Sequence, residues 1–434
     1  ANKKDGHGTD WPIRYKDIAP WYDYVERFAG ISGSQEGLPH LPDGIFQPPM
    51  EMSCVERHFK QKIENHFDER KLIISRTANL TKPTKEQLEL GRSKCQFRNE
   101  CMRGCSFGAY FSSQSATLPA AERTGNLTII TDTIAHSVIY DPETKKASGI
   151  NTINVKTKIK KEYKAKVVFL CASTLSSTQI MLNSTSQEFP NGIANSSGVL
   201  GHYLMDHIFH AGAKGKLKTH ESSYYSGRRP NGVYIPRFQN LSTNHPDFIR
   251  GYGYEGWSSR EGWSRHTDSN AYGKDFKNSL QKPGRWEFEI MGFGEMLPQF
   301  KNHVRLDPTN LDPLGMPLLH VSCEHSDNER AMQKNMKEEA VAMLKIAGLQ
   351  EVEGYARIRP PGLCIHEMGT ARMGHDEKTS VLNKFNQTHD VDNLFVTDGS
   401  AMTSNACQNP SLTYMALTAR AVDYAVKQMQ LGNI

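Results

Sequence analysis

One short stretch restricts the fold of this chain more than any other: the apolar run at residues 165–171, with the sequence AKVVFLC. A nearly continuous apolar run of this length is typical of a strand buried on both faces of a parallel sheet. Small residues follow at positions 172–174, and a helical pattern then continues through Gln179 to Leu182. Nucleotide-binding folds use this order of strand, turn and helix, with a phosphate at the start of the helix. The stretch therefore predicts an α/β chain.

The composition changes between residues 207 and 296, where aromatic residues and glycine dominate. Short runs of alternating polarity, such as residues 286–291, predict an antiparallel sheet, and residues 329–349 have the pattern of an amphipathic helix. Exposed aromatic rings suit the C–H faces of sugar rings, but the same residues would serve equally well as an ordinary core. The residues concerned are Tyr252, Tyr254, Trp257, Trp263, Trp286, Phe288 and Phe293.

The spacing of apolar residues predicts further helices and strands in the rest of the chain. The expected helices cover residues 15–28, 54–65 and 118–123, and the expected strands cover 71–75, 127–131, 137–140 and 149–155, with a hairpin continuing through 156–163. Together these elements predict a mixed α/β and α+β fold. An incomplete Rossmann-like domain would lie beside a domain built on an antiparallel sheet flanked by helices.

The overall composition excludes several classes of protein. The chain has 434 residues and a net charge of +5, from 52 basic and 47 acidic side chains, with no basic arm or stripe, so nucleic-acid binding is not expected. The longest apolar run, residues 167–172, is far shorter than the roughly 20 residues that span a bilayer, and no signal-peptide pattern opens the chain. Eight cysteines in 434 residues do not indicate a disulfide scaffold.

Two residues near the C-terminus, His366 and Asn409, are candidates for catalysis. Asn409 precedes Pro410 and a helical pattern over residues 411–429; asparagine is a good N-cap, and proline suits the first helical position. The positive end of that helix would stabilise negative charge beside Asn409. A neutral histidine, with an ordinary pKa of about 6.5, can take the proton of an alcohol whose carbon gives up a hydride. Taken alone, each residue more often has a structural role.

The surrounding motifs resemble a known family. Residues 366–374 (HEMGTARMG), 393–400 (NLFVTDGS) and 409–413 (NPSLT) are similar to the C-terminal signature of the glucose–methanol–choline (GMC) flavoprotein oxidoreductases. They look closest to the branch of bacterial glucoside 3-dehydrogenases and pyranose oxidase-like enzymes. The resemblance implies FAD as the cofactor, His366 as the catalytic base and Asn409 as the hydrogen-bond partner of the substrate oxygen. It also implies flavin contacts from Ile134, Ala172, Ser173, Asp398, Gly399, Asn409, Pro410 and Thr413.

Further segments along the chain resemble the same family, but one of its features is absent. The matching segments are residues 10–13 (DWPI) with Tyr22, 126–130 (NLTII), 167–182 and 198–207 (GVLGHYLMDH). The family opens with a strand and a G-x-G-x-x-G turn that holds the FAD pyrophosphate, whereas Gly30 and Gly33 follow a predicted helix. The resemblance therefore predicts that this chain lacks the dinucleotide-binding part of the flavin domain.

Cys95, Cys101 and Cys105 form a C-x5-C-x3-C pattern. Three thiolates from one loop suit a soft metal centre, whereas zinc would normally require a fourth ligand; reduced structural thiols, or a disulfide with one thiol left over, are the alternatives. The spacing resembles the cysteine loop of bacterial GMC-type dehydrogenase subunits. That resemblance implies a 3Fe-4S cluster, a cytochrome c-type electron acceptor, a small assembly subunit and a periplasmic rather than cytoplasmic location. The remaining cysteines are predicted to be buried small hydrophobic residues: Cys54, Cys171, Cys323, Cys364 and Cys407.

The sequence is consistent with three functions. The favoured one is an FAD-dependent dehydrogenase that oxidises a secondary hydroxyl of a sugar or glycoside, with C3 preferred, and passes electrons on through the cluster. The second is a pyranose oxidase-like enzyme that uses oxygen, and the third is a flavin-free, non-catalytic binding or assembly subunit. The expected segments are 1–94 (entry to the substrate domain), 95–125 (cysteine loop), 126–206 and 361–434 (flavin domain) and 207–360 (substrate domain).

Overall fold

The computed structural model of the protein describes residues 2–223, 230–262, 265 and 272–434; Trp263 lies outside these residues. The helices are α1 (Asn2–Asp5), α2 (Tyr15–Ala29), α3 (Cys54–His66), α4 (Lys85–Glu89), α5 (Leu118–Glu122), α6 (Thr174–Asn183), α7 (Gly273–Gln281), α8 (Asp327–Ile346) and α9 (Ser411–Gln430), with short helical turns η1 (Cys101–Arg103), η2 (Ser113–Thr117) and η4 (Gly399–Ala401). The strands are β1 (Ile73–Ile74), β2 (Thr133–Asp141), β3 (Lys146–Asn154), β4 (Lys160–Lys164), β5 (Val168–Leu170), β6 (Ile208–Leu217), β7 (Val233–Ile235), β8 (Tyr252–Arg260), β9 (Trp286–Gly294), β10 (His303–Leu311), β11 (Pro317–Ser322), β12 (Gln350–Ala356) and β13 (Leu394–Val396).

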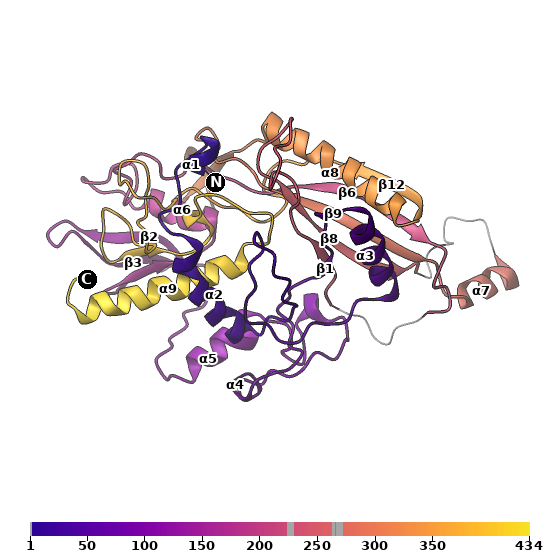
Figure 1. Ribbon diagram of the computed structural model, residues 1–434. Coiled ribbons are helices and arrows are strands. Elements are labelled where there is room, and N and C mark those ends of the chain that lie inside the picture. Colours follow the sequence, from indigo (N-terminus) through magenta and orange to yellow (C-terminus); the bar gives the residue numbers. More distant parts are fainter. Residues whose placement is uncertain (1, 224–229, 263–264, 266–271) are drawn as a thin grey trace.

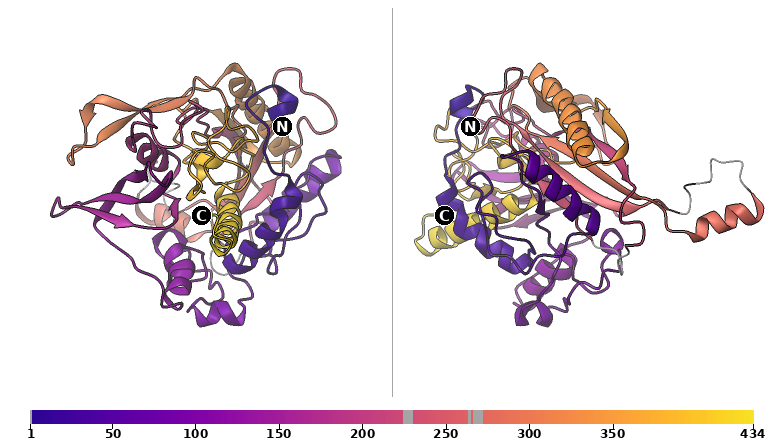
Figure 2. Two further views of the ribbon diagram at one scale, coloured as in Figure 1. Left: turned by 90° about the vertical axis from the view of Figure 1, so that its left-hand side faces the viewer. Right: turned by 45° about the vertical axis from the view of Figure 1, so that its right-hand side comes forward.

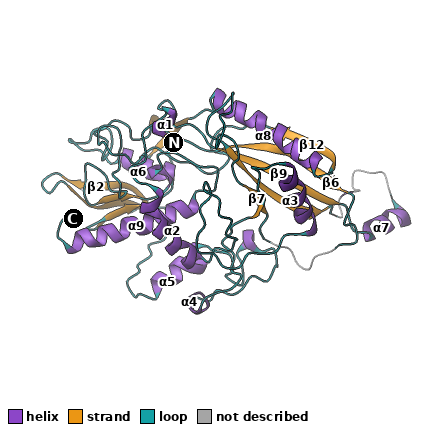
Figure 3. Ribbon diagram, viewed as in Figure 1, coloured by secondary structure: helices purple, strands orange, loops and turns teal. Residues whose placement is uncertain are grey.

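The largest sheet is antiparallel and has six strands in the order β1-β7-β8-β9-β6-β12. Helices α3 and α8 cover one of its faces (Figures 1 and 3). The core between them includes Phe59, Tyr254, Phe288, Ile290 and Met336, all of which are fully buried. Because successive side chains of a strand point to opposite faces, the neighbours of these residues point the other way, toward the cavities described below.

A second core lies around β5 and β13, the pair of strands that runs parallel. Strand β5 leads into α6, and α9 packs beside α2 (Figure 1). The antiparallel sheet β2-β3-β4 and the hairpin β10-β11 extend from this part of the molecule (Figure 2). Among the described residues, no helix is both long and apolar enough to cross a membrane.

Most of the predicted elements are present, and two details of the predictions are wrong. Residues 127–131 form no strand, and Ile129 and Ile130 are exposed; no neighbouring strand in the described part of the chain pairs with this segment, and a strand needs such a partner. Pro410, not Asn409, occupies the N-cap of α9. The mixed α/β fold class is confirmed, whereas the division into five segments stays a prediction.

The aromatic residues of the large sheet serve mainly as core. Tyr252, Tyr254, Trp286 and Phe288 are at most 1% exposed, whereas Trp257 is 38% exposed. The prediction that Cys171 is buried is wrong: this residue is exposed at the end of β5, because it lines an open cavity there. Cys54 and Cys323 are half-buried. The alternating pattern therefore predicts the sheet correctly but does not by itself distinguish a ligand-facing ring from a core ring.

The contact between α3 and the sheet generates a stability prediction. The rings of Phe59 and Phe288 lie 4.5 Å apart between their centroids, so Phe288→Ala would leave a cavity that the sheet cannot close. We expect the free energy of unfolding to fall by about 3–5 kcal/mol, measured by chemical denaturation. Leu318→Ala, at a position that is 44% exposed on β11, is the control. An equal loss in both variants would contradict the assignment of this core.

Candidate active site

The loop that carries His366 is held by one buried carboxylate. Asp206, only 1% exposed, precedes β6 and accepts backbone N–H bonds from Gly362 (2.7 Å), Cys364 (3.1 Å) and His366 (3.2 Å). Ile365 has a φ of 59°, which is a costly conformation for a β-branched residue. The three bonds from the loop to Asp206 compensate for that strain, so the position of His366 is imposed by the fold.

The His366 ring contacts three other side chains. Its Nδ1 atom lies 3.0 Å from Nδ1 of His207 and 3.5 Å from Sγ of Cys364, and its Nε2 atom lies 3.4 Å from Nδ2 of Asn409. The rings of His207 and His366 are almost perpendicular, at 88°. The structure thus brings the two predicted catalytic residues together and adds His207 behind them.

The hydrogen bonds of His207 determine which nitrogen of His366 is free to act as a base. Nε2 of His207 lies 2.5 Å from the carbonyl oxygen of Ala406, which can only accept, so this nitrogen carries the proton. In a neutral imidazole the other nitrogen is an acceptor, so Nδ1 of His207 accepts a hydrogen bond from Nδ1–H of His366. Nε2 of His366 therefore keeps its lone pair, and this atom faces Asn409.

Burial keeps both histidines neutral. Burial, followed by the neighbouring His366, lowers the pKa of His207 well below its ordinary value. Burial also lowers the pKa of His366, and the Asp206 carboxylate only partly opposes this effect. At neutral pH the lone pair on Nε2 of His366 is thus available to accept a proton.

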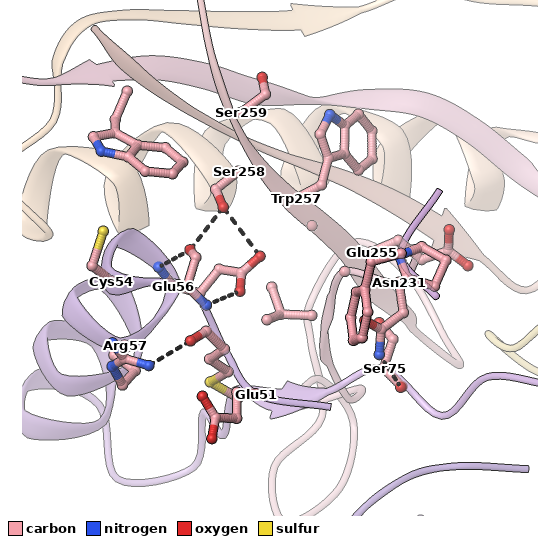
Figure 4. Close-up of a pocket in the computed structure, with 18 of the residues that line it drawn as sticks. Glu51, Cys54, Glu56, Arg57, Ser75, Asn231, Glu255, Trp257, Ser258 and Ser259 are labelled. Carbon is pink, nitrogen blue, oxygen red and sulfur yellow. Dashed lines mark hydrogen bonds between the residues drawn. The ribbon is translucent and has the colours of Figure 1, made fainter. Parts of the chain in front are cut away.

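A cavity of about 570 Å³, the catalytic cavity, opens beside Asn409. Its walls come from α2, the loop around residues 38–46, strands β7 and β8, and the start of α9. Asn409, Tyr234 and Glu255 all line it. Glu255 and Ser75 also line an outer cavity of about 1020 Å³, where they lie on one side and Cys54 and Arg57 on the other (Figure 4). The volume of the catalytic cavity is in the range of small-molecule sites.

A separate cavity of about 750 Å³ collects residues predicted to contact the flavin. Ser173, Asp398 and Gly399 line it together with Tyr414, whose buried hydroxyl has no hydrogen-bond partner among the described residues. A Cβ atom on Gly399 would lie 2.9 Å from that hydroxyl. An unsatisfied donor beside a position that excludes larger side chains fits a polar ligand such as FAD. The same cavity reaches Ile365, next to His366.

The other predicted flavin contacts lie in different surroundings. Pro410 and Thr413 line the catalytic cavity at the start of α9, and the Thr413 hydroxyl bonds to that of Tyr22 at 2.7 Å. The Asp398 carboxylate accepts from Ser177 (2.5 Å) and from the Ser400 hydroxyl (2.6 Å), so it shapes the loop. Ala172 is exposed after β5, and Ile134 is 37% exposed on β2 and lines none of these cavities.

The three clustered cysteines share one loop but do not converge on a single point. All three are free thiols, and burial raises the pKa of Cys95, with a smaller contribution from Cys101 and Cys105. In the described part of the chain, a different group of potential metal ligands does converge. The ligand atoms of His207, Cys364 and His366 lie within 4.8 Å of one another. The cysteine loop therefore does not have the compact geometry of a single-ion site.

The sequence patterns do not predict a role for the residues behind His366. Asp206 and His207 end the segment 198–207 that resembles the family. Two polar residues directly after the apolar run 203–205 were the available signal, because such residues are buried only when they have partners. Cys364 is buried as predicted, and it also contacts the base.

The fold and the site together define a class of protein. Flavin-dependent oxidoreductases of alcohols combine three features that this chain has. These are a histidine base beside an amide donor, the N-terminus of a long helix, and a strand–turn–helix unit with an open ligand cavity. Family models described as GMC oxidoreductase match residues 10–209 and 298–418. The chain belongs to the GMC oxidoreductase family and is an FAD-dependent oxidoreductase that acts on the CH–OH group of alcohols or sugars.

Individual relatives agree with this assignment. The chain is 31% identical to 2-methyl-1,2-propanediol dehydrogenase of Mycolicibacterium austroafricanum, over 96% of this chain and 74% of that protein. It is 25% identical to the fructose dehydrogenase large subunit of Gluconobacter japonicus, over 98% of this chain and 76% of that protein. The crystal structure of pyridoxine 4-oxidase from Mesorbium loti shares the fold, with a TM-score of 0.57 at 14% identity, over 98% of this chain and 79% of that one.

The hydrogen bonds of His207 lead to a kinetic prediction. His207→Gln keeps an acceptor for His366 and a donor for Ala406, whereas His207→Leu keeps neither. We expect His207→Leu to lower kcat by about 10–100-fold and His207→Gln to restore most of it. Equal activity of both variants would rule out the positioning role of His207.

In the unaltered enzyme, the plot of kcat/KM against pH should show activity above the lowered pKa of His366 and a loss below it, with a midpoint under about 6.5.

Proposed function

We propose that this enzyme oxidises a secondary hydroxyl of a sugar or glycoside, with C3 as the preferred position. One observation carries the proposal: the unprotonated Nε2 of His366 lies 3.4 Å from Nδ2 of Asn409, a residue that lines the catalytic cavity. A substrate hydroxyl between them can donate its proton to His366 and accept a hydrogen bond from Asn409. The similarity to fructose dehydrogenase supports a sugar substrate, and the resemblance of the C-terminal signature to glucoside 3-dehydrogenases supports C3.

The residues of the chain perform the proton chemistry. His366 takes the hydroxyl proton through Nε2, and His207 stabilises the resulting cation because it accepts the Nδ1–H bond. Asn409 donates a hydrogen bond to the same oxygen and thereby fixes its position beside the base. Bound FAD supplies the acceptor for the hydride. The residues that would hold it are Ser173, Gly399, Pro410, Thr413 and Tyr414, and the positive end of α9 favours negative charge on it.

A test of the base uses His366→Ala. Removing a general base that acts in the transition state should lower kcat by about 10²–10⁴-fold, with a smaller change in KM. His375→Ala, at an exposed position nine residues further along the same segment, is the matched control and should leave turnover unchanged. Steady-state kinetics with a glycoside and an artificial electron acceptor measures both. Near-normal turnover by His366→Ala would overturn the assignment.

We further propose that electrons leave through a cluster on Cys95, Cys101 and Cys105 to a cytochrome c-type acceptor, with a small assembly subunit, in the periplasm. The thiols are free and do not converge on one point. A cluster takes one thiolate on each of several irons, so it suits that spacing better than a single ion does. The second candidate is a cluster-free oxidase, in which these thiols are structural.

Iron analysis of the holoenzyme distinguishes the two routes. The cluster predicts about three iron atoms per chain and a paramagnetic signal at low temperature in the oxidised protein. Cys101→Ser should remove the iron and the reduction of a cytochrome acceptor, while reduction of the flavin by substrate persists. Cys54→Ser, at a half-buried cysteine on α3, is the control. An active enzyme without iron would favour the oxidase.

A further inference from the structure

Glu255 places a carboxyl in the wall of the catalytic cavity. It lies on β8, on the face opposite to α3 and α8, and it lines the catalytic cavity. It also lines the outer cavity (Figure 4). Burial raises its pKa. Within the described residues, the Glu255 carboxyl has neither a hydrogen bond nor an ion pair. The residue is half-buried, so its carboxyl is open to the cavity, and a ligand that donates a hydrogen bond can reach it.

Tyr234 adds a phenol hydroxyl at the same place. It lies directly opposite Glu255 in the antiparallel pair of β7 and β8, so both side chains project from the same face. Its hydroxyl is buried and makes no hydrogen bond of good geometry within the described residues; the Gln408 side chain is its nearby polar neighbour. A Cβ atom at Gly253 would lie 2.2 Å from that hydroxyl, so glycine leaves the room that the phenol needs. Burial raises the pKa of Tyr234, and the phenol therefore stays a donor.

The pair is close to the catalytic residues. Asn409 lines the same cavity as Tyr234 and Glu255. Burial, followed by the charges of Asp206 and Glu255, raises the pKa of the Cys364 thiol, and Cys364 contacts His366 at 3.5 Å. A small substrate whose hydroxyl reaches His366 could therefore also reach Glu255 and Tyr234.

The hydrogen-bonding needs of the pair select the class of ligand group. Glu255 as a carboxylate needs a donor, and the Tyr234 phenol needs an acceptor. A sugar hydroxyl both donates and accepts, whereas an ammonium group only donates and would leave Tyr234 unsatisfied. Arg76 is a cation of the cavity wall. Its guanidinium is held by Asp43 at 2.8 Å and by the carbonyl of Pro42 at 2.7 Å, so it does not occupy the site between Glu255 and Tyr234.

We propose that Glu255 and Tyr234 form a subsite that binds a non-reacting hydroxyl of the sugar and thereby selects which carbon faces His366. The inference rests on the proposed oxidation of a sugar or glycoside. Two hydroxyls of one ring would be fixed at once, the reacting one between His366 and Asn409 and the second between Tyr234 and Glu255. Two fixed points on one ring determine which carbon is presented to the base.

The test combines variants of the holoenzyme with deoxy substrates. Methyl glucoside, its monodeoxy analogues and its 2-amino analogue are compared on the unaltered enzyme, Glu255→Leu, Glu255→Gln and Tyr234→Phe. We expect Glu255→Leu to raise KM for methyl glucoside about 10–100-fold with a smaller change in kcat, and Glu255→Gln to have a mild effect because its amide oxygen still accepts. One deoxy analogue should be bound equally weakly by the unaltered enzyme and by Glu255→Leu. Glu353→Leu, which changes an exposed residue of the same sheet, is the control.

Each outcome of these measurements either supports or overturns the Glu255–Tyr234 subsite. Unchanged KM values in Glu255→Leu, with a normal requirement for His366, would overturn the subsite and leave the proposed function intact. A preference for the amino analogue that is lost in Glu255→Gln would replace the hydroxyl with an ammonium group and also overturn it. If the unaltered enzyme oxidises no sugar, the proposed function and the subsite both fail. Should Glu255→Leu not fold, Tyr234→Phe and the deoxy series on the unaltered enzyme still decide, because a subsite requires one analogue to bind worse than the others.

Discussion

The active site depends on one hydrogen-bond chain, from the Ala406 carbonyl through His207 to His366. The carbonyl can only accept, so it orients the proton of His207, and His207 in turn orients that of His366. The result is a lone pair on Nε2 of His366, the nitrogen that lies beside Asn409. A base whose tautomer is set by the backbone needs no rearrangement before it accepts a proton, and such preorganisation lowers the cost of the chemical step.

Both cores of the molecule contribute to this arrangement. The segment before β6 supplies Asp206 and His207, and the loops around β13 and α9 supply His366, Ala406 and Asn409. The large sheet closes the opposite wall with Tyr234 and Glu255. The catalytic cavity therefore lies where the two cores meet, which is a common position for a ligand site.

The sequence allows the fold class, most helices and the catalytic pair to be predicted, because these depend on local patterns and on a specific signature around His366 and Asn409. The role of His207 depends on a contact between residues 159 positions apart, and no local pattern reports such a contact. The strand expected at 127–131 failed for a related reason, since a strand depends on its neighbour. Exposed and buried aromatic residues of β8, such as Trp257 and Tyr254, differ only in the face that the register gives them.

Nitrogen magnetic resonance of the protein with ¹⁵N-labelled histidine tests the central claim most directly, because it reports which ring nitrogen carries the proton. With the His366 signals assigned by comparison with His366→Ala, the hydrogen-bond chain predicts a protonated Nδ1 and a bare Nε2 at neutral pH. His207 should show the opposite pattern, with Nε2 protonated. A proton on Nε2 of His366 in the resting enzyme would contradict the account, because that nitrogen could not then act as the base.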